Sequence, residues 1–240
     1  MTRKLVYPAA FTFVSLGILL GLGFWQWQRR SEKAELIQTI QTRIGESPAP
    51  LAVLGRLETL GQPTFAYRPV RATGRFDHGQ EAHVFFALAK PKNGIGGPGY
   101  LIVTPFHLTN GGTILVNRGF VPQDRKAAAS REGGQVAGES EITGLIRLPE
   151  RRGMFANPDD PARNIFYVRD PLTIAASRGL GPVAPVIIDL KTPVPAGGLP
   201  LPDVTLVDIP NNHLQYALTW WSLAAVLGII FLLWSRQAGR

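Results

Sequence analysis

The chain has 240 residues, a net charge of +8, 45% hydrophobic residues and no cysteine. The lack of cysteine excludes a disulfide framework and a thiolate metal site. The charge does not indicate nucleic-acid binding, because the basic residues are scattered and form no stripe interleaved with aromatic side chains.

The first predicted element is a membrane-spanning helix in the uncharged run Leu5–Trp27. About 20 apolar residues in a helix cross a bilayer. A cleaved signal peptide is the alternative, but its apolar stretch is usually about 7 to 15 residues long and ends at small residues. This run is longer and ends in Phe24-Trp25-Gln26-Trp27, which favours a retained anchor. Apolar residues then recur at helical spacing from Arg29 to Ile44, so we expect the same helix to continue outward.

The middle of the chain predicts a β-rich domain. An irregular segment from Pro48 to Pro69 precedes apolar runs that are separated by turn residues. The clearest hairpin is joined by Asn110-Gly111-Gly112, because Asn-Gly accepts the positive φ angles of tight turns. The predicted strands are 70–76, 83–89, 100–108, 113–121, 142–148, 164–168 and 186–190, with short helices at 123–132 and 172–178 and a Pro/Gly-rich linker at 192–202.

The last predicted element is a second membrane helix in the uncharged run Leu214–Trp234. We expect domains at 1–28 (N-terminal transmembrane helix), 29–212 (extracytoplasmic β-rich domain) and 213–240 (C-terminal transmembrane helix). The fold class is thus a membrane protein, with a two-helix transmembrane hairpin enclosing a mainly antiparallel β (α+β) domain. Positive charges near the spans weakly favour both termini inside the cytoplasm, which places the domain outside it.

Small residues in both apolar runs predict close helix packing. Gly17 and Gly21 form a G-x-x-x-G pattern, and Ala224 and Gly228 repeat the spacing in the second run. Such spacing lets two backbones approach closely in lipid. We therefore expect the two helices to pack as a hairpin through these residues.

Motifs for soluble chemistry are weak. Gly94, Gly96 and Gly99 spell G-x-G-x-x-G, but a β-like run follows where a phosphate loop needs a helix. His78 and His83 are five residues apart, which puts them on opposite faces of a strand, so we expect surface histidines and no metal site. The G-x-S-x-G pattern of a hydrolase nucleophile is absent, and we expect no enzyme activity.

A histidine at the start of the second membrane helix is the strongest binding candidate. His213 shares a helix face with Ala217, Trp220 and Ala224, and Tyr216 lies beside that face. An imidazole with an aromatic neighbour and small residues below it suits a flat, apolar, iron-bearing ligand. The alternative is a polar residue that only begins the helix.

Several short segments, in order along nearly the whole chain, form a recognisable set. They are Trp25-Gln26 with Arg29 and Lys33, Gly99-Tyr100, Thr104-Pro105, Leu115 to Pro122, Asn157, Asp160 to Asn164, Arg169-Asp170 and Pro210 to Trp220. Together they resemble one family, the Surfeit-locus assembly factors of cytochrome c oxidase. Phe120 departs from the tryptophan usual at its position in that family, a conservative aromatic change.

The resemblance implies a non-enzymatic role in maturing a haem-copper oxidase. It implies transient binding of haem a and its insertion into oxidase subunit I, with His213 as the iron ligand and Tyr216 and Trp220 beside the ring. Subunit I is the implied partner, and haem a synthase is a second candidate. The chain begins almost at its first span without an Arg/Ser-rich presequence, so we expect a bacterial inner membrane with the domain in the periplasm.

Two alternatives stay open at this point. The chain could be a scaffold that stabilises an oxidase assembly intermediate without touching haem, or a membrane-anchored enzyme, for which the sequence offers no candidate residues. Arg118 is a further question, since a guanidinium in a β-like run needs partners. We expect a carboxylate or backbone carbonyls to hold it, whether its role is structural or a contact with the oxidase or a haem propionate.

Overall fold

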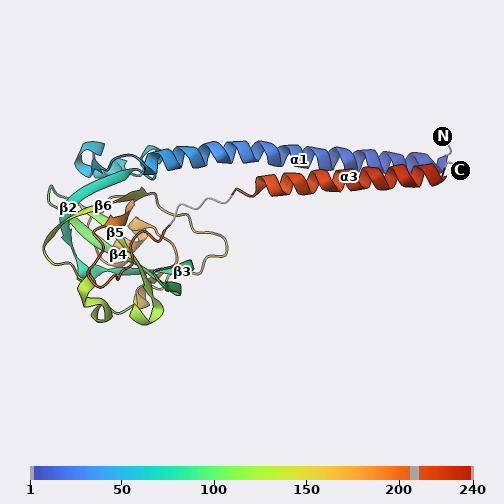
Figure 1. The fold of residues 1–240 in the computed structure, drawn as a ribbon. Helices are drawn as coiled ribbons and strands as arrows, with labels where there is room; N and C mark the ends of the chain where they lie inside the picture. The colour runs from blue at the N-terminus through green and yellow to red at the C-terminus, as the bar shows by residue number, and fades with distance from the viewer. Residues whose placement is uncertain (1–2, 206–210, 239–240) are drawn as a thin grey trace. The chain divides into compact units, whose positions relative to one another are not determined.

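The computed structural model describes residues 3–205 and 211–238. The chain divides into two compact units, one made of Met1–Gln41 with Asp208–Arg240 and the other of Thr42–Val207. The first contains the long helices and the second is a β domain, as Figure 1 shows. Each unit is described by itself below.

The helical unit contains the two apolar helices that the sequence predicts. Helix α1 is Arg3–Ile44 and helix α3 is His213–Ala238. Both are long and apolar enough to cross a membrane. Their large apolar side chains are mostly exposed, for example Phe11 at 74% and Ile230 at 58%, so their surface is suited to lipid. The expected continuation of the first helix to Ile44 is confirmed, because α1 runs through without a break.

Aromatic contacts pair α1 and α3 in antiparallel directions. The rings of Phe13 and Phe231 lie 6.1 Å apart, and those of Trp27 and Trp221 lie 6.0 Å apart. Since Phe13 is early in α1 and Phe231 is late in α3, the helices run in opposite directions. The helical hairpin is therefore present in the described residues.

The glycine pattern predicted for this packing is wrong in detail. A Cβ added at Gly17, Gly21 or Gly228 would meet nothing within 4 Å, so these residues do not face the other helix. The close approach is at Gly23, where an added Cβ would lie 2.2 Å from the indole nitrogen of Trp221. The rotation of α1 is set by this bulky indole, which the G-x-x-x-G spacing does not take into account.

The β domain is a mixed sheet that closes on itself. The strand order is β1-β2-β6-β8-β5-β4-β3-β7, and an additional β2–β4 pairing joins β2, β6, β8, β5 and β4 into a ring. Pairs β1–β2, β3–β7 and β5–β8 are parallel, and the other pairs are antiparallel. The described strands are β1 (Ala49–Pro50), β2 (Pro69–Phe76), β3 (Ala82–Lys92), β4 (Ile95–Leu108), β5 (Thr113–Pro122), β6 (Glu139–Arg147), β7 (Ile165–Phe166) and β8 (Ile187–Thr192).

The interior of the ring is filled by alternate residues of its five strands. Period-two alternation places every second side chain on the same face of a strand. One buried cluster draws its members from all five strands, which identifies it as the inner core. These members are Val70, Ala72, Phe106, Leu108, Ile114, Val116, Ile142, Ile146, Ile188 and Leu190.

A second apolar layer covers the outer face of part of the ring. Helix α2 (Pro171–Ser177) begins with the side chain of Asp170 accepting a hydrogen bond from the Leu172 amide. Its Ile174 packs in a cluster with Leu101 and Leu115 of the ring. Side chains of β3, β7 and the segment 199–204 belong to the same cluster.

Most predicted strands are confirmed, with ends shifted by a few residues. The β4–β5 hairpin turns at Gly111 and Gly112, whose φ angles of 94° and 88° require glycine-like freedom. Segment 123–132 is not one α-helix but two 3₁₀ segments, η5 (Gln123–Arg125) and η6 (Ala128–Gly134). Gly94 lies in the turn between β3 and β4, with φ 76°, so the glycine run belongs to a hairpin.

Candidate functional site

His213 is the first residue of α3 and is oriented by α1. Its Nδ1 atom lies 2.7 Å from the side-chain oxygen Oε1 of Gln26. An amide oxygen only accepts hydrogen bonds, so the imidazole Nδ1–H donates this one. In that tautomer the lone pair is on Nε2, the nitrogen available to a metal ion. A metal-binding histidine commonly has such a second-nitrogen hydrogen bond.

The start of α3 is fixed by further contacts within the helical unit. The side-chain Nδ2 of Asn211 donates a hydrogen bond of 3.2 Å to the backbone carbonyl oxygen of Arg30. The Arg30 guanidinium lies 5.1 Å from the centre of the Trp27 ring, which in turn contacts Trp221. The histidine therefore lies at a well-contacted end of the helix pair.

The small residues of α3 that were expected to lie open below His213 are instead buried. Ala217 is fully buried and Ala224 is 4% exposed, which is the burial expected where α3 packs on α1. These small residues thus do not form an open floor for a flat ligand. The Tyr216 side chain is 55% exposed and Trp220 is half-buried. The accessible flank beside His213 is therefore aromatic.

Arg118 is buried in the β domain, and the prediction of a backbone partner is confirmed. Its Nη2 donates to the carbonyl oxygen of Gly134, and its Nη1 lies 3.1 Å from Nδ1 of His78. Its guanidinium lies 5.2 Å from the centre of the Phe76 ring. The pKa of Arg118 is lowered to about 10, mainly because the guanidinium is buried. The Glu81 charge raises this pKa and the Arg131 charge lowers it further.

Arg118 lies in a β-bulge of strand β5. Between the pairs Leu101–Phe120 and Val103–Asn117, strand β5 has one more residue than β4, which is a β-bulge. Gly119 lies in this bulge with φ 127°. An added Cβ there would lie 2.1 Å from the carbonyl oxygen of Leu201, so the bulge requires glycine.

Glu81 and Arg131 form a buried ion pair next to this arginine. Arg131 Nη2 donates to Glu81 Oε1, and His83 Nε2 lies 3.1 Å from the same oxygen. Burial would raise the pKa of Glu81, but the hydrogen bonds from His83 and Arg131 outweigh it and lower that pKa. Asn164 adds a hydrogen bond of 2.8 Å to the Glu81 carbonyl oxygen.

The prediction that His78 and His83 are surface residues is wrong. His83 is 9% exposed and His78 is half-buried, and burial lowers the pKa of His78. Glu81 is their neighbour in sequence, but Arg118 of β5 and Arg131 of η6 come from separate elements, so no local pattern reveals these two partners. In the part of the chain that the structure describes, no three His, Asp or Glu residues are placed to hold a metal ion.

A second polar cluster surrounds Asp189 of β8. Asn117 donates a hydrogen bond of 2.8 Å to it and Thr205 donates one of 2.5 Å. Arg147 and Arg169 form ion pairs with it at 3.4 Å and 3.5 Å. The Asp189 charge raises the pKa of Arg169 despite its burial. Strand β5 therefore contributes to two polar clusters through neighbouring residues, since Asn117 contacts Asp189 and Arg118 lies beside Glu81 and Arg131. Sequence analysis did not predict either cluster.

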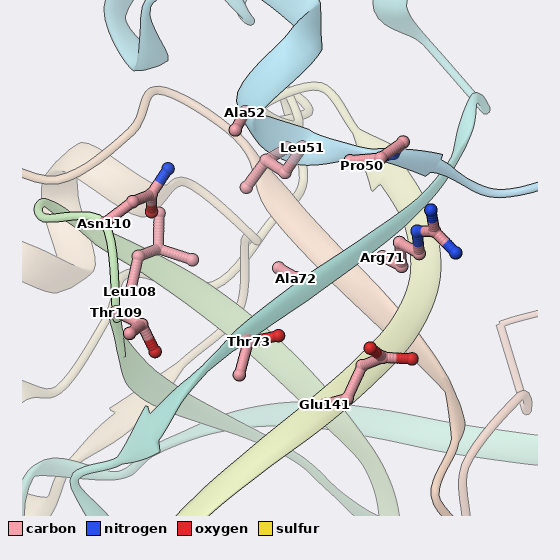
Figure 2. Close-up of a pocket in the computed structure, with 10 residues that line it drawn as sticks. All are labelled: Pro50, Leu51, Ala52, Arg71, Ala72, Thr73, Leu108, Thr109, Asn110 and Glu141. Carbon is pink, nitrogen blue, oxygen red and sulfur yellow. The ribbon is translucent and has the colours of Figure 1, made fainter.

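An open hollow of about 570 Å³ lies on another part of the β domain. Figure 2 shows its lining residues, which include Arg71 of β2, Glu141 of β6 and Asn110 of the turn after β4. Among the described residues that line it, none is a histidine, and Arg71 and Glu141 are its charged members. The hollow therefore offers no ligand for haem iron, and His213 remains the candidate.

Comparisons with known proteins identify relatives along most of the chain. The family model described as the SURF1 family matches residues 13–225. The chain is 35% identical over 230 residues to Surfeit locus protein 1 of Rattus norvegicus, covering 92% of this chain and 72% of the rat protein. It is 36% identical over 222 residues to the Homo sapiens protein of that name, covering 88% and 72%. A SURF1-like protein of Monosiga brevicollis is 34% identical over 239 residues, covering 93% and 85%.

Proposed function

Because this chain belongs to the SURF1 family, we propose that it is a membrane-anchored, non-enzymatic assembly factor for a haem-copper oxidase. In this proposal it binds haem a through His213 and assists its insertion into oxidase subunit I. The two apolar helices hold it in the bilayer. Haem a is large and apolar, so a binding site at the edge of a membrane suits it.

The observation that carries the haem proposal is the hydrogen bond between His213 and Gln26. It leaves Nε2 with a free lone pair, which is the donor that haem iron accepts from histidine. Tyr216 and Trp220 lie on the same flank of α3 and would contact the macrocycle. Haem supplies the iron and the porphyrin, and this chain supplies one nitrogen ligand and an aromatic flank.

A transfer protein must also release its cargo. One protein ligand on a partly exposed helix end binds less tightly than a closed pocket that buries most of the ligand. Oxidase subunit I is the proposed acceptor, and haem a synthase is the proposed donor.

An absorption spectrum tests the haem proposal directly. The chain is expressed with a haem a biosynthesis pathway and purified in detergent, as the parental protein and as His213→Ala. The substitution should remove the haem signal while the protein stays folded and inserted, because the apolar length of α3 is unchanged. The exposed histidine His107 provides the control, and His107→Ala should retain haem at the parental level.

The second candidate function is a scaffold that holds an oxidase intermediate without binding haem. The burial of the α3 small-residue face favours it, because the surface once expected to receive haem is already occupied. Parental protein that purifies without haem, yet is needed for oxidase assembly, would support the scaffold. A His213→Ala variant that retains haem at the parental level would exclude His213 as the essential ligand.

We further propose that the chain lies in a bacterial inner membrane with both termini in the cytoplasm. The β domain is then periplasmic, and His213 lies at the outer edge of the bilayer. A reporter active only outside the cytoplasm should work when fused near Gly111 and fail when fused after Arg240. The opposite pattern would contradict delivery of haem from the periplasmic side.

A further inference from the structure

Two apolar side chains project from a loop of the β domain. The loop follows β6, and its Met154 and Phe155 side chains are 92% and 94% exposed. No large apolar side chain in the described part of the chain is more exposed than these two. Exposing this much apolar surface to water is unfavourable, and adjacent apolar residues at a protruding tip are typical of an interaction surface.

The loop holds this tip in a defined turn. The Ala156 amide donates a hydrogen bond of 3.1 Å to the Gly153 carbonyl oxygen, so Met154 and Phe155 are the two central residues of a tight turn. Arg152 donates to the Asn157 carbonyl oxygen and forms an ion pair with Asp159 across the loop. These contacts fix the turn, and the turn holds the two apolar side chains in solvent.

The base of the loop is fixed to the domain as well. The Glu150 amide donates to the Arg169 carbonyl oxygen at 3.1 Å, and the side chains of these residues form an ion pair. At the other end, the Tyr167 amide donates to Asp159 at 2.7 Å. Both ends of the loop are thus joined to the segment that leads into α2.

A positive charge accompanies the apolar tip. Arg151 precedes the turn and is exposed. Within the described residues, the ion pairs of the loop involve Glu150, Arg152 and Asp159 but not Arg151. An exposed arginine next to apolar residues is the combination that attracts a segment to anionic lipid headgroups while the apolar side chains enter the interface.

We propose that the turn formed by Gly153 to Ala156 inserts Met154 and Phe155 into the interface of an anionic bilayer, with Arg151 on the headgroups. The β domain is joined through both ends of its sequence to helices that can span the membrane, so a bilayer is always available at high effective concentration. A convex tip of two residues buries little area on a protein surface but enters a fluid interface without a matching pocket. The bilayer is therefore the occupant that these observations favour.

The test uses the full chain, whose lack of cysteine permits single-site labelling. Met154→Cys carries an environment-sensitive fluorophore, and Asn110→Cys, in the exposed β4–β5 turn, carries it as the reference. Both are reconstituted in vesicles of phosphatidylcholine with and without phosphatidylglycerol. Quenching by nitroxide-labelled lipid should be at least about threefold greater at 154 than at 110, and should increase with phosphatidylglycerol.

Two variants in the 154-labelled chain identify the groups responsible. Phe155→Ser and Arg151→Gln should each reduce lipid quenching by about half or more, because one removes apolar area and the other removes charge. Val53→Ser is the matched control, since Val53 is another apolar side chain of the domain with 70% exposure, and it should change nothing. These surface positions carry little of the fold, so all three variants should insert and fold.

Two results would overturn the proposal. Equal quenching at 154 and 110 would show that the tip stays in water beside the bilayer. Shielding of the 154 label in detergent by added oxidase subunits, without lipid quenching in vesicles, would assign the tip to a protein partner instead. Neither result depends on haem binding, so the lipid proposal and the haem proposal can fail separately.

Discussion

A single hydrogen bond decides which nitrogen of His213 is free. Gln26 accepts from Nδ1, which leaves Nε2 for a metal. We expect Gln26→Met to weaken haem retention by about 10- to 100-fold, the effect usual for the loss of such a partner. Gln28 is exposed on the same helix and provides the control. Retained haem is measured by absorbance after detergent washing, and equal loss in Gln28→Met would remove the assigned role of Gln26.

The buried pair Glu81–Arg131 contributes to the acid stability of the β domain. The pKa of Glu81 is lowered in the folded state. Its ionisation therefore stabilises the fold above the unfolded-state pKa of about 4.5, and this contribution is lost as pH falls through the lowered folded pKa. Glu81→Gln should reduce the free energy of unfolding at neutral pH by about 3 kcal/mol, because it leaves Arg131 buried and unpaired.

Denaturant unfolding of the full chain in detergent at several pH values measures this effect. The parental protein should lose stability below about pH 4.5, and the Glu81→Gln variant should lose less over that range. Glu58 is exposed and provides the matched substitution Glu58→Gln, which should change neither value. A Glu81→Gln profile parallel to the parental one would show that another group causes the acid transition.

At the scale of elements, one glycine governs the contact between the helices. Gly23→Val should separate α1 from α3, because its Cβ would overlap the Trp221 indole. Gly21→Val should be tolerated, since a Cβ there meets nothing within 4 Å. The readout is cross-linking of Phe13→Cys to Phe231→Cys by a short bifunctional thiol reagent, since the parental rings at these positions are 6.1 Å apart. Efficient cross-linking in Gly23→Val would contradict the close approach.

The bulge in β5 gives a second prediction at this scale. Gly119→Ala should destabilise the β domain by about 3 kcal/mol or more, because it combines a positive φ with a clash against the Leu201 carbonyl. Gly181→Ala is the control, since its Cβ would meet nothing within 4 Å. Thermal unfolding followed by near-ultraviolet circular dichroism compares the two variants, and similar melting temperatures would contradict the assignment.

Local patterns predicted the elements well but not their assembly. The apolar runs predicted α1 and α3, and Asn110-Gly111 predicted the β4–β5 hairpin, because these signals lie within a few neighbouring residues. The β2–β4 pairing that closes the ring joins Gly74 to Leu108, and no local pattern specifies it. The rotation of α1 was also missed, because it depends on Trp221, which is distant in sequence.

The candidate site was predicted only in part for the same reason. His213 was identified by its place at the start of an apolar run, but its partner Gln26 is 187 residues away. Arg118 was expected to be held by a carboxylate or backbone carbonyls, and a carbonyl accepts from it. That acceptor, the Gly134 carbonyl, lies at the end of η6, two residues beyond the short helix expected at 123–132.

At the scale of the whole molecule, the two compact units should respond separately to substitution. The chain divides between helices and β domain. We expect Glu81→Gln to lower the unfolding midpoint of the β domain and to leave the cross-link between positions 13 and 231 intact. Gly23→Val should reduce this cross-link and leave the unfolding midpoint of the β domain unchanged. Both quantities can be measured on the same detergent preparations. A loss of cross-linking in Glu81→Gln would show that the units are energetically coupled.

The order of synthesis gives the Gln26–His213 hydrogen bond a further meaning. The ribosome makes Gln26 early and His213 only 187 residues later, after the complete β domain has been synthesised. A partly translated or partly inserted chain thus lacks the oriented imidazole. The contact that orients the proposed iron ligand forms only when the last helix has joined the first, so under this proposal an ordered haem ligand marks a finished molecule.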